Sequence, residues 1–94
     1  MRIEISSRIR KKLTEKHGVS EDEIVQCFSN SSNIYLEDKR AWHKTNPPTK
    51  WFIAGTDSGR NLKVVFMLDQ DGSIHIKSAF EPNAAELRIY AKYA

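Results

Sequence analysis

Two glycine-bearing turns divide the segment between residues 51 and 80 into three short runs rich in apolar residues. The runs are Trp51–Thr56, Asn61–Leu68 and Ser73–Phe80, separated by turns at 57–60 and 69–72. Connections this short join antiparallel neighbours, because a parallel pair needs a crossover of roughly a dozen residues or more. The segment therefore predicts a three-stranded antiparallel meander, which the rest of the chain must cover on its apolar side.

Alternation along the second and third runs predicts which face of this sheet is buried. Successive side chains of a strand point to opposite faces. The predicted inner face carries Leu62, Val64, Phe66, Leu68, Ile74, Ile76 and Phe80, and the predicted outer face carries Lys63, Val65, Met67, His75, Lys77 and Ala79. One face is thus apolar, whereas the other is cationic and mixed.

Capping signals predict three helices around the meander. They are expected from Ser6 or Ser7 to His17, at Glu21–Phe28 and at Ala84–Tyr93. Gly18 supplies the left-handed residue that commonly ends a helix. The second and third helices each begin with the spacing of a capping box, in which a polar side chain and a Glu three residues later satisfy each other's backbone N–H groups.

Two further runs, Arg2–Ile5 and Asn33–Glu37, are strand candidates, whereas residues 38–50, which include Pro47 and Pro48, are expected to form a loop. The predicted order is β-α-α-β-β-β-β-α, with all three helices on the apolar face. The chain is therefore predicted to be one α+β domain over residues 1–94. Its antiparallel sheet of four to five strands would be packed on one face by helices.

Composition narrows the functional classes. The net charge of +3 favours anionic partners. Cys27 is the only cysteine, so no disulfide framework is expected, and its place on an apolar helix stripe predicts an inert core thiol. No apolar run approaches the roughly 18 residues of a membrane-spanning helix, and no signal-peptide pattern is present. A cytoplasmic protein without membrane contact is expected.

Neither a metal nor another cofactor is expected. The three histidines, His17, His43 and His75, lie far apart in the sequence and do not have the spacing of metal ligands. The glycines at 55 and 59 do not form a phosphate-binding loop motif. Any catalysis is therefore expected to use protein side chains alone.

The cationic outer face is the main candidate for a functional surface. Lys63, His75 and Lys77 are expected to point to the same side, with Arg60 at the rim. Cations can bind RNA phosphates and stabilise a pentavalent phosphate, and a histidine can transfer protons near neutral pH. Together they would allow cleavage through the RNA 2′-hydroxyl without a metal. The alternative is the ordinary charged, solvated face of an antiparallel sheet.

Two other features are candidates for RNA binding. Arg8, Lys12 and Lys16 follow one another at four-residue steps on the first predicted helix. This basic stripe would attract phosphate, although a solvated helix face has the same pattern. Trp51 and Trp42 flank the prolines. One of these rings is expected to pack the loop down, and the other, with Trp51 as our candidate, to stack on a base.

Three short motifs, over residues 8–93, occur in the order found in BrnT-type toxins. They are KHGVS at 16–20 with an acidic helix ending at Phe28, GRNL at 59–62 running into an apolar strand, and IHIKSA at 74–79 followed by a helix containing Glu86, Arg88 and Tyr90. The chain resembles this family by the order and spacing of these motifs. Phe80 stands where the family has an arginine after Ser-Ala.

BrnT-like proteins have a RelE-like fold and act as metal-independent ribonucleases that stop translation. A cognate antitoxin encoded alongside neutralises them. The resemblance therefore implies RNA, free or ribosome-associated, and an antitoxin as partners. It also implies that Arg60 is a catalytic or RNA-binding arginine and that His75 and Lys77 lie in the active strand.

Three hypotheses about function follow. The first is a toxin-type endoribonuclease in which Arg60, Lys63 and Lys77 hold phosphate and His75 carries the proton. The second is a non-catalytic protein-interaction module that uses the open sheet face, and Phe80 motivates it. The third is a small hydrolase of unknown substrate, because the C-terminal half is also similar to short bacterial proteins labelled ADP-ribosyl-(dinitrogen reductase) hydrolase.

Overall fold

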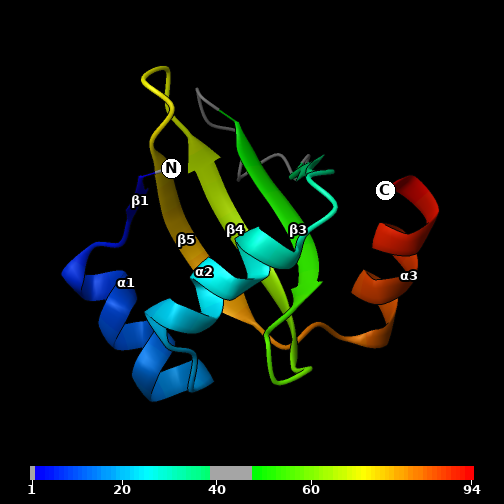
Figure 1. Cartoon of the computed structure of the whole chain (residues 1–94), viewed down its shortest axis with the longest axis horizontal. Helices are drawn as coiled ribbons and strands as arrows, with labels where there is room; N and C mark the ends of the chain where they lie inside the picture. Colours follow the sequence, from blue (N-terminus) through cyan, green and yellow to red (C-terminus); the bar gives the residue numbers. More distant parts are fainter. Residues whose placement is uncertain (1, 39–47) are drawn as a thin grey trace.

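The computed structural model describes residues 2–38 and 48–94 (Figure 1). Its elements are β1 (Ile3–Glu4), α1 (Ser7–Lys12), the π-helical turn η1 (Leu13–His17), α2 (Glu21–Asn30), β2 (Leu36–Glu37), β3 (Thr49–Gly55), β4 (Asn61–Leu68), β5 (Ile74–Phe80) and α3 (Ala84–Tyr93). The predicted α+β class and the predicted order of elements are confirmed. Most of the predicted loop, with Trp42, His43 and Pro47, lies outside the described residues, and β3 already begins at Thr49 rather than at Trp51.

The sheet has five strands in the order β1-β5-β4-β3-β2. The meander β3–β4–β5 is antiparallel throughout, as predicted, and β2 pairs antiparallel with β3. The first strand differs, because β1 lies parallel to β5 with Ile3 opposite Ile74 and Glu4 opposite His75. The sheet is therefore mixed, and the chain between β1 and β5, which contains α1, η1, α2 and the other three strands, provides the long connection that a parallel neighbour requires.

The core lies between the inner face of the meander and α2. Phe52, Leu62 and Val64 are fully buried there, and Phe28 from α2 packs on Phe52 with ring centroids 4.8 Å apart. The thiol of Cys27 also faces this core and donates to the carbonyl of Ala54 over 3.6 Å. Cys27 is fully buried, which confirms its predicted core position, and this burial raises the pKa of its thiol to about 11.

The turn from η1 to α2 follows the local signals closely. Ser6 caps α1 by accepting from the backbone N–H of Ile9, and Gly18 ends η1 with a φ of 59°. Ser20 and Glu23 form the predicted capping box at the start of α2. Ile24 of this helix is fully buried, whereas its neighbour Val25 is 42% exposed, because it lies on the solvent side of α2.

A β-bulge in β5 changes which side chains reach the core. Val65 pairs with Ser78 but the next residue, Phe66, pairs with Ile76, so Lys77 is the extra residue. An extra residue reverses the alternation beyond it. Ala79 is therefore fully buried in the core, whereas Phe80 lies opposite Lys63 on the outer face. The predicted positions of Ala79 and Phe80 were both wrong for this reason.

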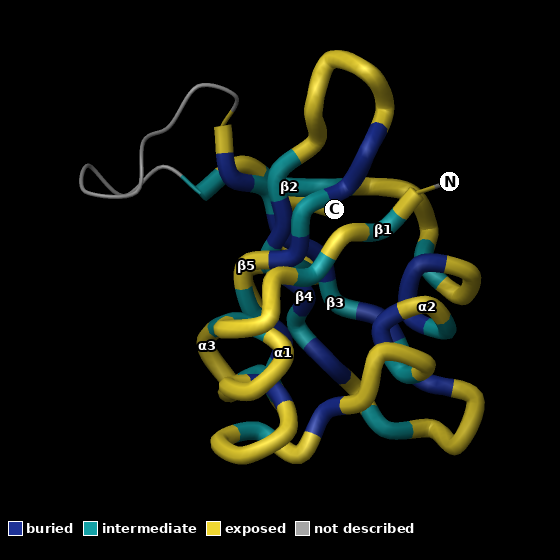
Figure 2. Tube along the Cα trace, turned by 90° about the vertical axis from the view of Figure 1, so that its left-hand side faces the viewer, coloured by how far each residue is buried: buried dark blue, intermediate teal, exposed yellow. Residues whose placement is uncertain are grey.

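The third helix covers the outer face, not the inner one. Tyr90 of α3 packs against Trp51 with ring centroids 5.7 Å apart, and Glu86 lies 2.7 Å from the ammonium of Lys63. Trp51 and Lys63 alternate with the core residues Phe52 and Leu62, so they point to the outer face. Figure 2 shows α2 and α3 on opposite sides of the strands. The expectation of three helices on one face is thus corrected, and α3 leaves only part of the outer face open.

Candidate functional site

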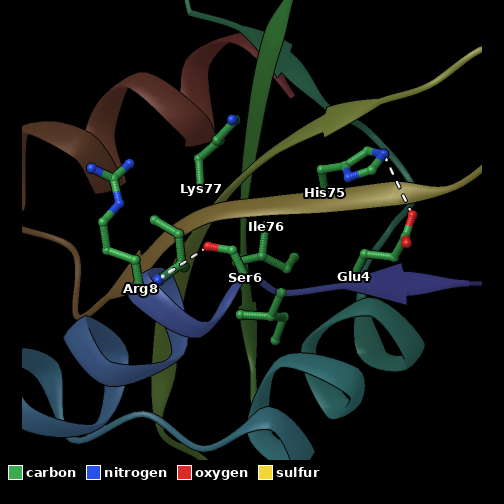
Figure 3. Close-up of a pocket in the computed structure, with 8 residues that line it drawn as sticks. Glu4, Ser6, Arg8, His75, Ile76 and Lys77 are labelled. Atoms are coloured by element: carbon green, nitrogen blue, oxygen red, sulfur yellow. Dashed lines mark hydrogen bonds and ion pairs between the residues drawn. The ribbon is translucent and has the colours of Figure 1, made fainter.

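A groove of about 370 Å³ runs between the N-terminal segment and β5 (Figure 3). It is lined by Glu4, Ile5, Ser6, Arg8, Ile9, His75, Ile76 and Lys77. Two of the predicted catalytic residues, His75 and Lys77, and one predicted RNA-binding residue, Arg8, therefore meet in one place. Glu4 and Ser6 were not predicted as site residues.

The parallel pairing of β1 with β5 builds this groove. Glu4 is the register partner of His75, so the carboxylate and the imidazole lie side by side. Two residues later Ser6 caps α1, which places Arg8 in the first turn of the helix at the groove. In Figure 3, His75 and Lys77 rise from the same side of β5, whereas Ile76 points away from them. The fold thus brings an acid, a histidine and two cations together from both ends of the chain.

The imidazole of His75 lies among oxygen atoms. Its Nε2 atom is 3.2 Å from a carboxylate oxygen of Asp69, 3.6 Å from one of Glu4 and 3.3 Å from the hydroxyl of Ser73. Hydrogen-bond partners on a ring nitrogen fix the orientation of the imidazole. His75 is also 40% exposed through its side chain, so solvent and ligands can reach it.

Two cations share the groove with His75. Arg8 and Lys77 are both exposed, and neither makes an ion pair with any residue of the described ranges 2–38 and 48–94. Lys77 owes its position to the bulge, since it is the residue that β5 leaves without a partner on β4. Cations without an ion-pair partner can bind an anionic ligand, and a histidine beside them can exchange a proton with that ligand.

The side chain of Arg60 makes hydrogen bonds and ion pairs with other parts of the same chain. Its guanidinium donates to the carbonyls of His17 and Gly18 over 3.1 and 2.9 Å, which closes the C-terminal end of η1. It also pairs with Glu23 at 3.2 Å and with Glu81 at 3.4 Å. The Ser20 backbone N–H, helped by Arg60, lowers the pKa of Glu23. Arg60 therefore holds the α1–α2 junction onto the β3–β4 turn.

The positions of Arg60 and His75 along the sheet exclude a shared reaction centre. Arg60 directly precedes β4, and His75 pairs with Met67 near the other end of that strand. Seven residues of extended chain span roughly 23 Å. The predicted catalytic set of Arg60, His75 and Lys77 is thus divided, and only the last two belong to the groove.

Lys63 and Trp51 share the outer face with His75 but lie beneath α3. The Lys63 side chain is only 13% exposed, pairs with Glu86, and has its ammonium 4.5 Å from the centre of the Trp51 ring. Trp51 is buried between this lysine and Tyr90. Lys63 and Trp51, which were expected to bind RNA on the outer face, are therefore covered by α3. Lys12 is exposed on α1 but does not line the groove.

No group of three or more potential metal ligands occurs among the residues that the structure describes. The described helices are also too short and polar for any of them to cross a membrane. The chemistry that the groove offers is proton transfer at His75 beside Arg8 and Lys77.

The sequence did not indicate Glu4, Ser6 and Asp69 as site residues, because no local signal places them beside His75. Arg2–Ile5 was recognised as a strand, but the strand has no local signal for the edge of the sheet that it joins. Asp69 was assigned to a turn, and its approach to His75 depends on how that turn folds back on β5. Comparisons with known proteins add no assignment: no protein-family model matches the chain, and no curated protein matches it significantly.

Proposed function

We propose that this protein is a metal-independent endoribonuclease of the BrnT/RelE-like toxin type and that its RNA site is the groove between β1, α1 and β5. The observation that carries the proposal is the position of His75, held by Asp69 and Glu4 in a groove that also contains Arg8 and Lys77. The ordered motifs of the sequence support the same class. The proposal assigns no RNA contact to Arg60, Lys63 or Trp51.

The groove can supply what cleavage through the 2′-hydroxyl requires. Neutral His75 takes the proton of the 2′-hydroxyl as its oxygen attacks the adjacent phosphorus. Lys77 and Arg8 stabilise the added negative charge on the phosphorus-bound oxygens. The bond to the 5′-oxygen breaks, and this oxygen takes a proton from solvent, which leaves a 2′,3′-cyclic phosphate and a free 5′-hydroxyl. His75 then releases its proton to solvent, so no metal or other co-reactant is needed.

Single-stranded RNA fits the openness of the site. The His75 imidazole is partly exposed, and Arg8 and Lys77 are at the surface. Proteins that cleave or read RNA act mostly on unpaired segments whose backbone can be drawn across such cations. By the same resemblance, we propose that the protein acts in the cytoplasm, that its cleavage inhibits translation, and that a cognate antitoxin neutralises it.

The test combines induced expression with cleavage of purified RNA in the presence of EDTA. The wild type should arrest growth and leave 2′,3′-cyclic phosphate ends. His75→Asn should lower the cleavage rate by about 10²–10⁴-fold, because the general base is lost. Arg8→Gln and Lys77→Met should each lower it by about tenfold or more. Lys11→Gln is the matched control, since Lys11 is an exposed cation on α1 that does not line the groove.

Normal growth together with intact RNA would refute the proposal. Cleavage that persists in His75→Asn would move the active site elsewhere, and activity that is lost on metal removal would favour a metal-dependent hydrolase. A non-catalytic protein-interaction module is the second candidate, and a specific observation favours it. Arg60 and Lys63, two of the four residues that the first hypothesis used to hold phosphate or carry the proton, are committed to internal ion pairs. That candidate predicts a folded protein with no nuclease activity to lose.

A further inference from the structure

The polar contacts of His75 involve only one of its two ring nitrogens. Nε2 lies 3.2 Å from a carboxylate oxygen of Asp69 and 3.3 Å from the Ser73 hydroxyl. Its contact with Glu4, at 3.6 Å, is drawn in Figure 3. No residue in the described parts of the chain hydrogen-bonds to Nδ1. The proposed reaction requires one of these two nitrogens to be unprotonated.

The hydroxyl of Ser73 is buried and can only accept from His75. A hydroxyl carries a single proton. The Ser73 oxygen lies 2.5 Å from Oδ1 of Asp71, which also accepts the backbone N–H of Ser73 at 2.9 Å. These hydrogen bonds lower the pKa of Asp71, so its carboxylate is ionised and cannot donate. The Ser73 proton is therefore directed to Asp71, and a lone pair of the same oxygen faces Nε2.

Two carboxylates near Nε2 impose the same condition. An ionised carboxylate has no proton to donate. Asp69 is held in place because its other oxygen accepts the backbone N–H of Gln70, and its own backbone N–H donates to the carbonyl of Ser73, both over 2.9 Å. Glu4 is fixed opposite His75 by the strand register. The described groups around Nε2 are thus all acceptors, so the neutral ring carries its proton at Nε2.

We propose that Asp69 and Ser73, the latter held by Asp71, fix the proton of neutral His75 at Nε2 and so make Nδ1 the atom that takes the proton of the 2′-hydroxyl. A hydrogen bond at one ring nitrogen decides the protonation of the other. When Nδ1 accepts the proton, the ring becomes a cation with both nitrogens protonated, and Nδ1 later returns this proton to solvent. Asp69 and Ser73 are positioning residues, because they act through His75. The role of Nδ1 as base rests on the proposed function, whereas the position of the proton does not.

Nuclear magnetic resonance of the ring nitrogens tests the position of the proton in the purified full chain without RNA. At about pH 8, above the range in which imidazoles ordinarily titrate, long-range proton–nitrogen spectra should show Nε2 of His75 protonated and Nδ1 unprotonated. His17 is the internal control. Burial lowers the pKa of His17, and no described residue hydrogen-bonds to its ring, so its two nitrogens should give the intermediate shifts of a tautomer mixture. The spectrum of His75→Asn identifies the signals of His75.

Asp69→Asn combined with Asp71→Asn should change the tautomer. Each substitution replaces a group that can only accept with an amide that can also donate. Either the new amide or the released Ser73 hydroxyl can then donate to Nε2, so a measurable share of His75 should carry its proton at Nδ1. The proposal is overturned if wild-type His75 is protonated at Nδ1 or shows the same mixture as His17. It is also overturned if the double variant, folded by circular dichroism, keeps the wild-type tautomer.

Cleavage kinetics test the consequence for the base. Asp69→Asn should lower kcat about tenfold or more, because the ring loses its fixed proton and its orientation, and should change KM by less than about twofold. Asp22→Asn is the matched control, since Asp22 is exposed on α2 and its loss changes the net charge equally. An unchanged kcat for Asp69→Asn, in a protein that His75→Asn inactivates, would refute the positioning role. A wild type that cleaves no RNA would instead refute the proposed function, and the nitrogen spectra alone would then decide where the proton lies.

Discussion

At the scale of a residue, Arg60 makes structural contacts, although the family resemblance implied a catalytic or RNA-binding role for it. Its guanidinium contacts two carbonyls and two carboxylates from three separate segments of the chain. A planar group with five donors is suited to this task, whereas a lysine could satisfy only part of it. His75 and Lys77 differ because the turn and the bulge that hold them leave their functional atoms accessible. The structural role of Arg60 and the candidate functional roles of His75 and Lys77 therefore depend on the groups that surround each side chain, not on the residue type.

We predict that Arg60→Met lowers the free energy of unfolding by about 1–3 kcal/mol at neutral pH, because a half-buried, charge-assisted network is lost. The pKa of Glu23 is lowered in the folded protein, so this carboxylate contributes stability above its ordinary value of 4.5 and loses it as the pH falls through the folded value. The difference between wild type and Arg60→Met should therefore shrink below about pH 4.5. Urea denaturation at several pH values measures this difference.

Arg10→Met is the control for this prediction. Arg10 pairs with Glu21 at 2.7 Å, a shorter distance than any in the Arg60 pairs, but both side chains are about half exposed. Exposed pairs contribute about 0–1 kcal/mol. Equal losses in the two variants would show that Arg60 has no special role at the α1–α2 junction.

At the scale of an element, the change of direction between η1 and α2 depends on one glycine. Gly18 has a φ of 59°, and a Cβ atom added there would contact nothing within 4 Å. Gly18→Ala should therefore lower the free energy of unfolding by about 1 kcal/mol through backbone strain alone. Gly55→Ala is the matched control. Gly55 has no positive φ and its added Cβ would meet only the Asn61 side chain at 3.7 Å, an ordinary contact, so thermal unfolding should change little or rise.

The β5 bulge is the other decisive local feature. It sends Ala79 into the core and Phe80 to the outer face, and it leaves Lys77 exposed beside the His75 groove. A regular strand would have placed a large aromatic ring where only a methyl group is buried. One unpaired residue therefore sets both the packing of the strand end and a cation of the candidate site.

At the scale of the whole molecule, α3 closes part of the face on which RNA binding was expected. The Trp51–Tyr90 ring contact and the Lys63–Glu86 pair both tether it to the sheet. The pair is the more informative of the two, since both side chains are at most 20% exposed. Ion pairs that are screened from water have stronger coupling than exposed ones.

A double-mutant cycle with Lys63→Met and Glu86→Gln should give a coupling energy of about 1–2 kcal/mol in urea denaturation. Lys63→Met keeps the aliphatic stem over Trp51 and removes only the charge. Arg2 and Asp71 provide the control cycle, because they also lie 2.7 Å apart but are both more than half exposed. Their coupling should stay below about 0.5 kcal/mol. Similar coupling in the two cycles would mean that α3 does not screen Lys63 from water.

The amino-acid sequence by itself determined the features that short-range physical chemistry controls. Gly18 and the capping boxes at Ser20 and Asn83 placed the helices, and the turns at 57–60 and 69–72 placed the meander. Backbone conformation and capping involve neighbours within a few residues, so their signals can be read along the chain. The alternation of side chains along the second and third strands of the meander predicted that Lys63 and His75 share a face.

Tertiary structure alone decided the arrangement of the candidate site. The parallel docking of β1 on β5 brought Glu4 to His75, the bulge displaced Phe80, and α3 crossed to the outer face and covered Lys63. Each of these outcomes depends on contacts between residues ten or more positions apart in the sequence. No local propensity distinguishes one edge or face of the sheet from another, because that choice depends on which apolar surfaces and charges meet when the whole chain packs together.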